Sequence, residues 1–212
     1  LYIIFQMTKN KSSKQWLKSQ NQDLYVKKAR ESYFRSRAVY KLQEIDQKDK
    51  LIKPNHCVID LGSSPGGWSQ YLSSIIDSRG QIIAIDMLPM EPIGQVSYIL
   101  GDFTEEIVQK QCFIQVGKQG ADLVISDMAP NLTGIRVTDQ SRNIVLAEFV
   151  YDFCTRILKP GGDLLVKLFE GEGTHEYRQL LQDNFSKVLT RKPKASRDQS
   201  REFYILARSY KL

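Results

Sequence analysis

The sequence has few of the residues that hold small or metal-dependent proteins together. Its three cysteines, Cys57, Cys112 and Cys154, lie in apolar segments without C-x-x-C spacing, which predicts buried thiols rather than a disulfide framework or a zinc site. Its two histidines have no partner at metal-ligand spacing, so no metal is expected. No apolar run approaches the ~20 residues of a membrane span. We therefore expect a cytoplasmic protein, taken to be a monomer, with neither membrane nor metal as a partner.

Length and composition favour one folded domain. The chain has 212 residues, of which 42% are apolar and 25% charged, enough for a single well-packed core. Met7 is followed by a polar run, and the apolar stretch before it is too short for a signal peptide, so residues 1–6 are interpreted as lying outside the fold. Residues 1–22 then comprise these upstream residues and a mobile basic arm. Residues 23–212 form one domain, which includes a basic helical extension at 23–53.

Positive charge is gathered at the two ends of the chain. Residues 8–53 hold 13 basic and 5 acidic side chains, residues 186–212 hold 8 and 2, and residues 54–185 hold 9 and 17. A protein that binds a polyanion needs its cations on one surface. Two basic ends around an acidic body therefore favour nucleic acid as the partner, with solvated faces of amphipathic helices as the simpler alternative.

Hydrophobic patterning predicts strands that alternate with helices. Apolar runs of strand length, typical of strands buried on both faces, occupy 57–62, 81–86, 97–102, 121–127 and 163–169, and two further strands are expected at 186–191 and 202–208. Helical spacing predicts one or two helices in 23–50 and single helices at 68–76, 105–116, 143–158 and 175–184. This order is typical of an α/β fold with a parallel sheet covered on both faces, in which the last two strands form an antiparallel pair.

Acidic residues occur near the ends of four predicted strands, the edge at which open α/β sheets bind ligands: Asp60, Asp86, Asp102 and Asp127. The turn after the first strand carries three glycines that allow close approach of a ligand to the backbone: Gly62, Gly66 and Gly67. Asp86 comes 24 residues after Gly62, where a nucleotide-binding sheet places the acid that accepts hydrogen bonds from a ribose diol. A nucleoside-containing cofactor is implied, although each acid could instead satisfy local N–H groups.

The glycine turn lacks both common phosphate-binding patterns. In the dinucleotide fingerprint G-x-G-x-x-G, the second glycine would fall on Ser64, which is followed by Pro65. The P-loop pattern G-x-x-x-x-G-K-[ST] is also absent. Several acids around one pocket would repel a pyrophosphate but attract a cation. S-adenosylmethionine combines a ribose and an adenine with sulfonium and ammonium charges, so it fits these conditions, with S-adenosylhomocysteine as its product.

Five motifs together resemble one enzyme family. They are SRAVYK at 36–41, DLGSSPGGWS at 60–69, DMAPN at 127–131, LVKLFEGEG at 165–173 and SRDQSREFY at 196–204. The set resembles the FtsJ/RrmJ family of ribosomal RNA large-subunit methyltransferases, and the match covers essentially all of residues 8–210. Ser63 and Ser64 stand where alanines are common in that family. The glycine turn by itself would indicate only a methyltransferase-like sheet.

The resemblance implies a Rossmann-like class I S-adenosylmethionine-dependent methyltransferase fold, with a seven-stranded, mostly parallel sheet containing one antiparallel strand. It implies methyl transfer to the 2′-oxygen of a uridine in the A-loop of 23S ribosomal RNA, within the large (50S) ribosomal subunit. The family's catalytic tetrad falls on Lys41, Asp127, Lys167 and Glu202. Cofactor contacts fall on Gly66, Trp68, Asp86, Asp102 and Asp127, to which the glycine turn adds Gly62.

Lys167 is the expected general base. A ribose hydroxyl is a poor nucleophile, so a base must accept its proton while the oxygen is held in line with the S–CH₃ bond. Lys167 falls in a predicted buried strand, where an amine must be either paired or held neutral. We favour the neutral amine, because burial and the second cation Lys41 both disfavour its charge. Asp127 would align the donor and Glu202 would orient the lysines, with a structural ion pair between strands as the alternative.

Basic residues of two segments are predicted to bind RNA. Arg35, Arg37 and Lys41 would share one helical side near the cofactor, and the opposite rim would be formed by Arg191, Lys192, Lys194, Arg197 and Arg201. Such contacts reach phosphates and position the RNA, so specificity would come from the shape of the RNA loop and from splayed bases.

Two other functions stay open. The DMAPN segment superficially resembles the D/N-P-P-Y/F loop of amino methyltransferases, which would make the protein an RNA base N-methyltransferase. Ala129 and Asn131, however, do not supply the second proline and the terminal aromatic residue of that loop. The second alternative is a non-catalytic RNA-binding ribosome assembly factor, and the complete tetrad speaks against it.

Overall fold

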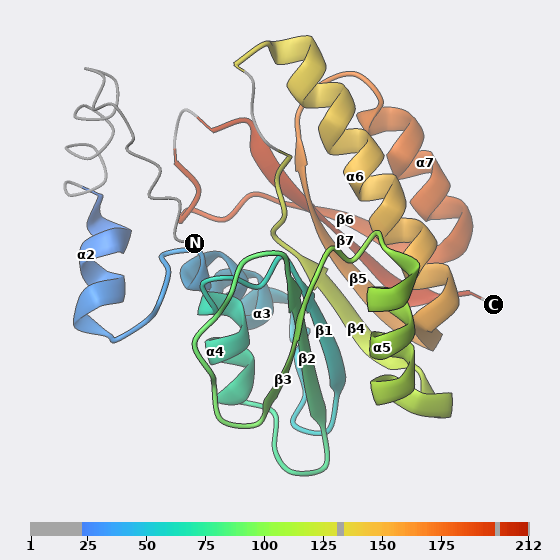
Figure 1. Cartoon of the computed structure of the whole chain (residues 1–212). Coiled ribbons are helices and arrows are strands. Elements are labelled where there is room, and N and C mark those ends of the chain that lie inside the picture. The colour runs from blue at the N-terminus through green and yellow to red at the C-terminus, as the bar shows by residue number, and fades with distance from the viewer. Residues whose placement is uncertain (1–22, 131–133, 198–199, 212) are drawn as a thin grey trace, which may run out of the picture.

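A computed structural model describes residues 23–130, 134–197 and 200–211, which contain one seven-stranded sheet (Figure 1). Its strands are β1 (Cys57–Leu61), β2 (Gln81–Asp86), β3 (Val96–Leu100), β4 (Ala121–Ser126), β5 (Leu158–Phe169), β6 (Phe185–Arg191) and β7 (Glu202–Tyr210). Their order across the sheet is β3-β2-β1-β4-β5-β7-β6. β7 is antiparallel to both β5 and β6, and the other neighbours are parallel. The predicted fold class is confirmed.

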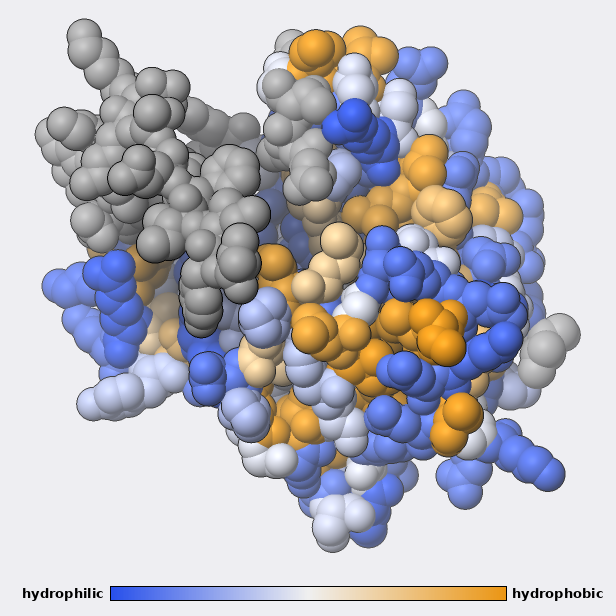
Figure 2. All heavy atoms as spheres, in the orientation of Figure 1, coloured by the Kyte–Doolittle hydropathy of each residue, from blue (hydrophilic) through white to orange (hydrophobic). Residues whose placement is uncertain are grey.

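Helices cover both faces of the sheet. One face is covered by α5 (Glu106–Val116), α6 (Arg136–Ile157) and α7 (Thr174–Asn184), and the other by α3 (Val39–Asp49) and α4 (Gly67–Ser73). A short 3₁₀ turn, η1 (Gly117–Gln119), follows α5. Beside α3 lies α2 (Leu24–Glu31), which buries Ala29 and exposes a hydrophilic outer surface (Figure 2).

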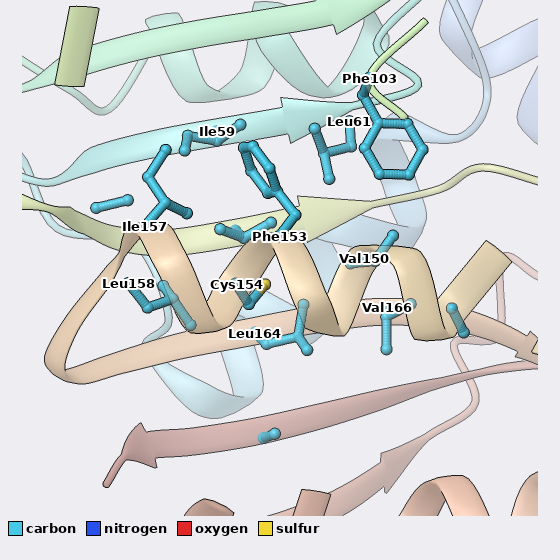
Figure 3. Packing of buried hydrophobic residues seen from close by; sticks show 14 of the residues in the cluster. Ile59, Leu61, Phe103, Val150, Phe153, Cys154, Ile157, Leu158, Leu164 and Val166 are labelled. Atoms are coloured by element: carbon cyan, nitrogen blue, oxygen red, sulfur yellow. The ribbon is translucent and has the colours of Figure 1, made fainter. Parts of the chain in front are cut away.

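Neighbouring residues of the central strands enter different cores. In β1, Val58 packs with residues of α3 and α4, whereas Ile59 packs with residues of α6. Figure 3 shows Ile59 and Leu61 next to Phe153 of α6. Because both faces are covered, nearly every position of a central strand is apolar, which explains the unbroken apolar runs in the sequence. A charged side chain in such a strand, such as Lys167 in β5, therefore marks a site with its own chemistry.

Two element boundaries differ from the prediction by more than three residues. α6 begins at Arg136 rather than at 143, because its first two turns are polar and lack the apolar spacing on which the prediction depended. β5 begins at Leu158 rather than at 163, and its register with β4 shifts between Ala121 and Leu123. Residues 160–162, Pro-Gly-Gly, lie inside this strand at the irregularity in its pairing with β4.

The basic segment at 23–53 forms two helices, α2 and α3. α2 ends in a left-handed turn, where Tyr33 has a φ of 58° and the N–H of Phe34 donates to the carbonyl of Ala29 at 2.8 Å. Arg35 and Arg37 lie in the connection that follows, so the prediction that they share one helical side with Lys41 is wrong. The expectations for residues 1–6 and for the basic arm up to residue 22 lie outside the described residues.

Within the described residues, no helix is long and apolar enough to cross a membrane, and no group of three or more His, Cys, Asp or Glu side chains could hold a metal ion. All three cysteines are free thiols. Cys112 and Cys154 are buried, as predicted, and Cys57 is half-buried.

Candidate active site

The four residues of the predicted tetrad lie together at the carboxyl edge of β4 and β5. Lys41 projects from α3, Asp127 directly follows β4, Lys167 belongs to β5, and Glu202 begins β7. They form two ion pairs. Lys167 Nζ lies 3.0 Å from Asp127 Oδ1, and Lys41 Nζ lies 2.6 Å from Glu202 Oε1. All four side chains are less than one fifth exposed, with Lys167 at 8%, so these charges interact in a poorly solvated site.

Tyr204 of β7 connects the two pairs. Its hydroxyl donates a 2.6 Å hydrogen bond to Asp127 Oδ1, and Lys41 Nζ lies 5.8 Å from the centre of its ring. Antiparallel pairing of β5 with β7 places Lys167 opposite Tyr204, and side chains two residues apart on a strand share a face, which brings Glu202 beside it. Tyr204 is a residue of this site that was not predicted from the sequence. A sequence signal for it was available: a tyrosine in a strand predicted to be buried lies two residues after Glu202, and a buried tyrosine hydroxyl needs a hydrogen-bond partner.

The charges around Asp127 decide its protonation state. Burial acts to raise the pKa of this carboxyl, but Lys167, Lys41 and the hydrogen bond from Tyr204 outweigh it, so the pKa lies below its ordinary value. Burial, together with the carboxylates of Asp127 and Glu202, raises the pKa of Tyr204 well above its ordinary value. Asp127 is therefore an anion at neutral pH, and Tyr204 is a neutral hydrogen-bond donor.

The structure corrects the expected state of Lys167. The sequence favoured an unpaired, neutral amine, whereas the amine is paired with the Asp127 carboxylate and also contacts the backbone carbonyl of Asp127. The order of the strands explains the difference: β4 lies next to β5, so the residue that follows β4 reaches the side chain of Lys167. The alternative that the sequence left open, a paired lysine, is the one observed.

The glycine turn after β1 is closely packed. Gly62 has a φ of 77° and Gly66 a φ of 107°, values that favour glycine. The Met128 side chain occupies the space that a side chain at position 62 would need. The N–H of Gly62 donates to the Ile85 carbonyl at 2.9 Å, which ties the turn to the end of β2. Both glycines therefore lie where a larger residue has no room, and the close approach of a cofactor to this turn stays a prediction.

The two strand-end acids beyond Gly62 both accept hydrogen bonds from loops at this edge of the sheet. Asp86 accepts hydrogen bonds of 2.8 Å from the backbone N–H groups of Ser64 and Leu88. Asp102 accepts from the N–H and the hydroxyl of Thr104 at 2.9 and 2.7 Å. These bonds fix the carboxylates, and since an ionised carboxylate has about four acceptor positions, both retain capacity for a ligand. Their contact with the cofactor stays a prediction.

Asp60 is an acid without a full set of partners. It lies in β1 with 1% of its surface exposed, one oxygen accepts a 2.7 Å hydrogen bond from the Ser69 hydroxyl, and Oδ1 has no partner in the described residues. Burial raises its pKa to about 7, the bond from Ser69 opposes this, and the carboxylates of Asp127 and Asp86 add to it. A buried acceptor without a partner, close to the carboxylates of Asp127 and Asp86, fits a ligand with a cationic, hydrogen-bond-donating end, such as S-adenosylmethionine.

Trp68 lies inside the core rather than at an open surface. It is 3% exposed, its indole N–H donates to the Ala38 carbonyl at 2.8 Å, and its ring centre lies 5.9 Å from that of Tyr204. The residue thus joins α4, the start of α3 and β7. Its predicted cofactor contact is not tested by this arrangement and stays a prediction.

A pocket of about 430 Å³ opens beside Lys41 and Glu202. Two arginines predicted to bind RNA, Arg37 and Arg197, line it together with Ala38 and Ser200. Arg37 is also held in place by other contacts, because its guanidinium pairs with Asp23 and donates to the Ala195 carbonyl. The pocket therefore joins the tetrad to the basic N-terminal extension.

The other cations predicted to bind RNA have diverse surroundings. Arg191 makes a two-pronged contact with Asp49 at 2.7 and 2.5 Å, which lowers the pKa of that acid and fixes the end of β6 to α3. Lys192 donates to the Ser200 carbonyl at 3.3 Å and Arg201 to the Glu170 carbonyl at 2.7 Å. The side chains of Lys192, Lys194, Arg197 and Arg201 are exposed, whereas Arg191 is half-buried.

Solved structures share this fold. A putative ribosomal RNA methyltransferase from Plasmodium falciparum superposes with a TM-score of 0.75 at 28% identity, covering 84% of this chain and 98% of that one. Fibrillarin from Aeropyrum pernix, solved with S-adenosyl-L-methionine, superposes with a TM-score of 0.56 at 16% identity over 82% and 74%, a likeness of fold alone. The sheet order, the glycine turn and the strand-end acids define an S-adenosylmethionine-dependent methyltransferase of the Rossmann-like class.

Sequence comparison identifies the family. The model of the FtsJ-like methyltransferases matches residues 34–210, and the chain belongs to this family. A relative from Dichelobacter nodosus is 51% identical over 96% of this chain and 98% of its own length, and one from Pseudomonas paraeruginosa is 48% identical over 97% and 99%. Both are named ribosomal RNA large subunit methyltransferase E. The resemblance drawn from the five motifs is confirmed.

Proposed function

We propose that this protein transfers a methyl group from S-adenosylmethionine to the 2′-oxygen of a uridine ribose in the A-loop of 23S ribosomal RNA, within the large ribosomal subunit. One observation carries the proposal: the buried pair of Lys167 with Asp127 lies beside the pair of Lys41 with Glu202, at the edge that holds the glycine turn. The names of the relatives support large-subunit ribosomal RNA as the substrate. The protein would act as a monomer in the cytoplasm.

Each charged residue has a separate task in this reaction. When bound, S-adenosylmethionine supplies the methyl group and leaves as the uncharged thioether S-adenosylhomocysteine. Lys167 Nζ accepts the proton that the 2′-hydroxyl loses as its oxygen bonds to the methyl carbon. Asp127 fixes this amine through the 3.0 Å pair. Lys41, held by Glu202, stabilises the negative charge that develops on the oxygen.

The pairing of Lys167 makes this mechanism dependent on pH. An ammonium group cannot accept a proton, so Lys167 can act as the base only in enzyme molecules whose Lys167 amine is neutral. A rate that does not change between neutral and alkaline pH would leave Lys167 as a structural partner of Asp127 and exclude it as the base.

The pocket beside Lys41 has the size and charge expected for a nucleotide of the substrate. Its volume of about 430 Å³ lies within the range of ligand pockets, and Arg37 and Arg197 supply cations to its lining. Lys192, Lys194 and Arg201 are exposed on the segment that precedes Glu202 and extend the basic surface. Since phosphate contacts release counterions, RNA binding should weaken steeply as salt increases.

The decisive experiment uses labelled S-adenosylmethionine and large ribosomal subunits from a strain that lacks the enzyme. Digestion of the product RNA to nucleosides should place the label on a ribose 2′-oxygen of uridine. Lys167→Ala should still bind the cofactor but lose methyl transfer, and Lys187→Ala, a lysine of β6 outside the site, serves as the matched control. A methyl group on a base would favour the base N-methyltransferase. RNA binding without any transfer would favour the assembly factor.

A further inference from the structure

Arg35 makes its contacts with the cofactor edge rather than with solvent. Its Nη1 donates to the carbonyl of Glu91 at 2.5 Å and to the carbonyl of Pro65 at 3.4 Å, and its Nη2 donates to the carbonyl of Pro92 at 2.9 Å. Pro65 belongs to the glycine turn, whereas Glu91 and Pro92 belong to the segment between β2 and β3. The guanidinium thus connects the segment before α3, which carries Arg35, with both of these parts of the chain. The sequence had placed Arg35 among the RNA contacts.

The residues that Arg35 holds form a strap, defined here as 87–93, over the glycine turn. A side chain at Gly66 would lie 2.8 Å from Ile93 and from Met90, and 3.1 Å from Arg35 Nη1, which shows how closely the strap and the arginine pack on the turn. The strap is continuous with Asp86, whose carboxylate binds the N–H of Leu88 at 2.8 Å. Moving the strap would therefore move the acid predicted to bind the cofactor ribose.

The backbone of Arg35 is itself fixed to the cofactor edge. Gln70 of α4 accepts a 3.0 Å hydrogen bond from the Arg35 N–H, and its amide donates to the Tyr33 carbonyl at 2.9 Å. The backbone that carries the Arg35 side chain is therefore held in place by protein contacts alone, before any ligand binds. A planar fork with five N–H donors suits several carbonyl acceptors at once, which the point charge of a lysine does not reproduce.

We propose that Arg35 is a positioning residue for the methyl donor, because it clamps the strap 87–93 onto the glycine turn and so fixes Asp86 for the nucleoside. The inference rests on the proposed S-adenosylmethionine site, but it assigns Arg35 to that site and not to RNA. Its donors face backbone carbonyls, which leaves them poorly placed for phosphate oxygens.

Titration of S-adenosylmethionine into the full chain, without RNA, tests this role. Arg35→Lys keeps the charge but loses the fork, and we expect it to weaken binding about tenfold, the effect of losing one charge-assisted hydrogen bond. In steady state it should raise KM for S-adenosylmethionine and leave kcat and KM for ribosomal subunits unchanged. Hydrogen exchange should accelerate in the strap alone. Arg30→Gln, which removes a nearby exposed charge on α2, should leave the titration unchanged and is the control.

Three results would overturn the inference. The first is unchanged S-adenosylmethionine binding by both Arg35→Lys and Arg35→Ala. The second is weaker RNA binding with cofactor binding intact, which would restore Arg35 to the RNA contacts. The third is faster exchange throughout the chain, which would make the residue a general stabiliser. If instead the unmodified protein does not bind S-adenosylmethionine, the proposed function fails first, so the two failures are distinguishable.

Discussion

Replacement of Tyr204 by phenylalanine tests whether the two ion pairs act as one electrostatic unit. Tyr204→Phe retains the buried ring next to Trp68 but removes the hydroxyl that donates to Asp127 at 2.6 Å. A hydrogen bond to a charged group contributes about 1.5–3 kcal/mol, so we expect the free energy of unfolding to fall by about 2 kcal/mol at pH 7. For a chain of this length that is a decrease in Tm of about 5 °C.

The pH dependence of this effect separates a charged acceptor from a neutral one. The pKa of Asp127 is lowered in the folded protein, so its stabilising contribution is present above its unfolded pKa and is lost as pH falls through its lower folded pKa. The difference between the original protein and Tyr204→Phe should therefore be full at pH 7 and should shrink in acid, as Asp127 becomes protonated. Urea denaturation from pH 7 down to the lowest pH at which the protein stays folded measures it.

Tyr177→Phe is the matched control. Tyr177 is also buried, but its hydroxyl donates at 2.9 Å to a neutral acceptor, the backbone carbonyl of Ala147. Its loss should cost about 1 kcal/mol, an effect independent of pH. If Tyr204→Phe were no more destabilising than Tyr177→Phe at pH 7, the assignment of Asp127 as a buried anion supported by Tyr204 would be refuted.

Three further predictions concern the edges of the site. Gly62→Ala places a side chain on a residue with a φ of 77°, and should lower the free energy of unfolding by about 2 kcal/mol and abolish S-adenosylmethionine binding, as melting curves and titration would show. The pKa of Asp60 is raised to about 7 in the folded protein, so ionisation of this acid disfavours folding. Between about pH 4 and pH 7, the free energy of unfolding should therefore fall for the original protein relative to Asp60→Asn, as denaturation at several pH values would show. Plots of unfolding free energy against pH that run parallel for the two proteins would contradict this. Arg191→Ala should lower Tm by removing the contact with Asp49 but leave the salt dependence of RNA binding intact. Arg197→Ala removes only a 3.7 Å ion pair between a partly exposed guanidinium and Asp23, so it should reduce that dependence with little change in Tm.

The sequence was sufficient to predict which segments form the strands of the sheet. Strands buried on both faces leave unbroken apolar runs, and the structure has strands at all seven predicted places. The position of β7 between β5 and β6 was not predictable in the same way, because local patterning identifies a hairpin but not which member of it enters the sheet. That one placement decides which side chains face Lys167.

The charged residues of the candidate site were predictable from the sequence, whereas the ion pairs that they form with one another were not. The motifs supplied the four charged residues that the structure brings together. The partner of Lys167 depends on strand order, and Tyr204 was hidden because an aromatic residue in an apolar strand is equally typical of the core. Counting cations could not distinguish Arg191, which is bound to Asp49, from an exposed cation such as Lys194.

The late position of β7 in the chain has a consequence for biosynthesis. During translation β5 and β6 leave the ribosome before β7. Until β7 arrives, β5 presents an unpaired edge, and β6, which pairs only with β7, has no partner in the sheet. Nascent chains at this stage also lack Glu202 and Tyr204, so they cannot yet carry out the proposed reaction. Premature termination before residue 202 would therefore release an inactive, aggregation-prone fragment with unpaired strand edges, a species that chaperones and proteases recognise.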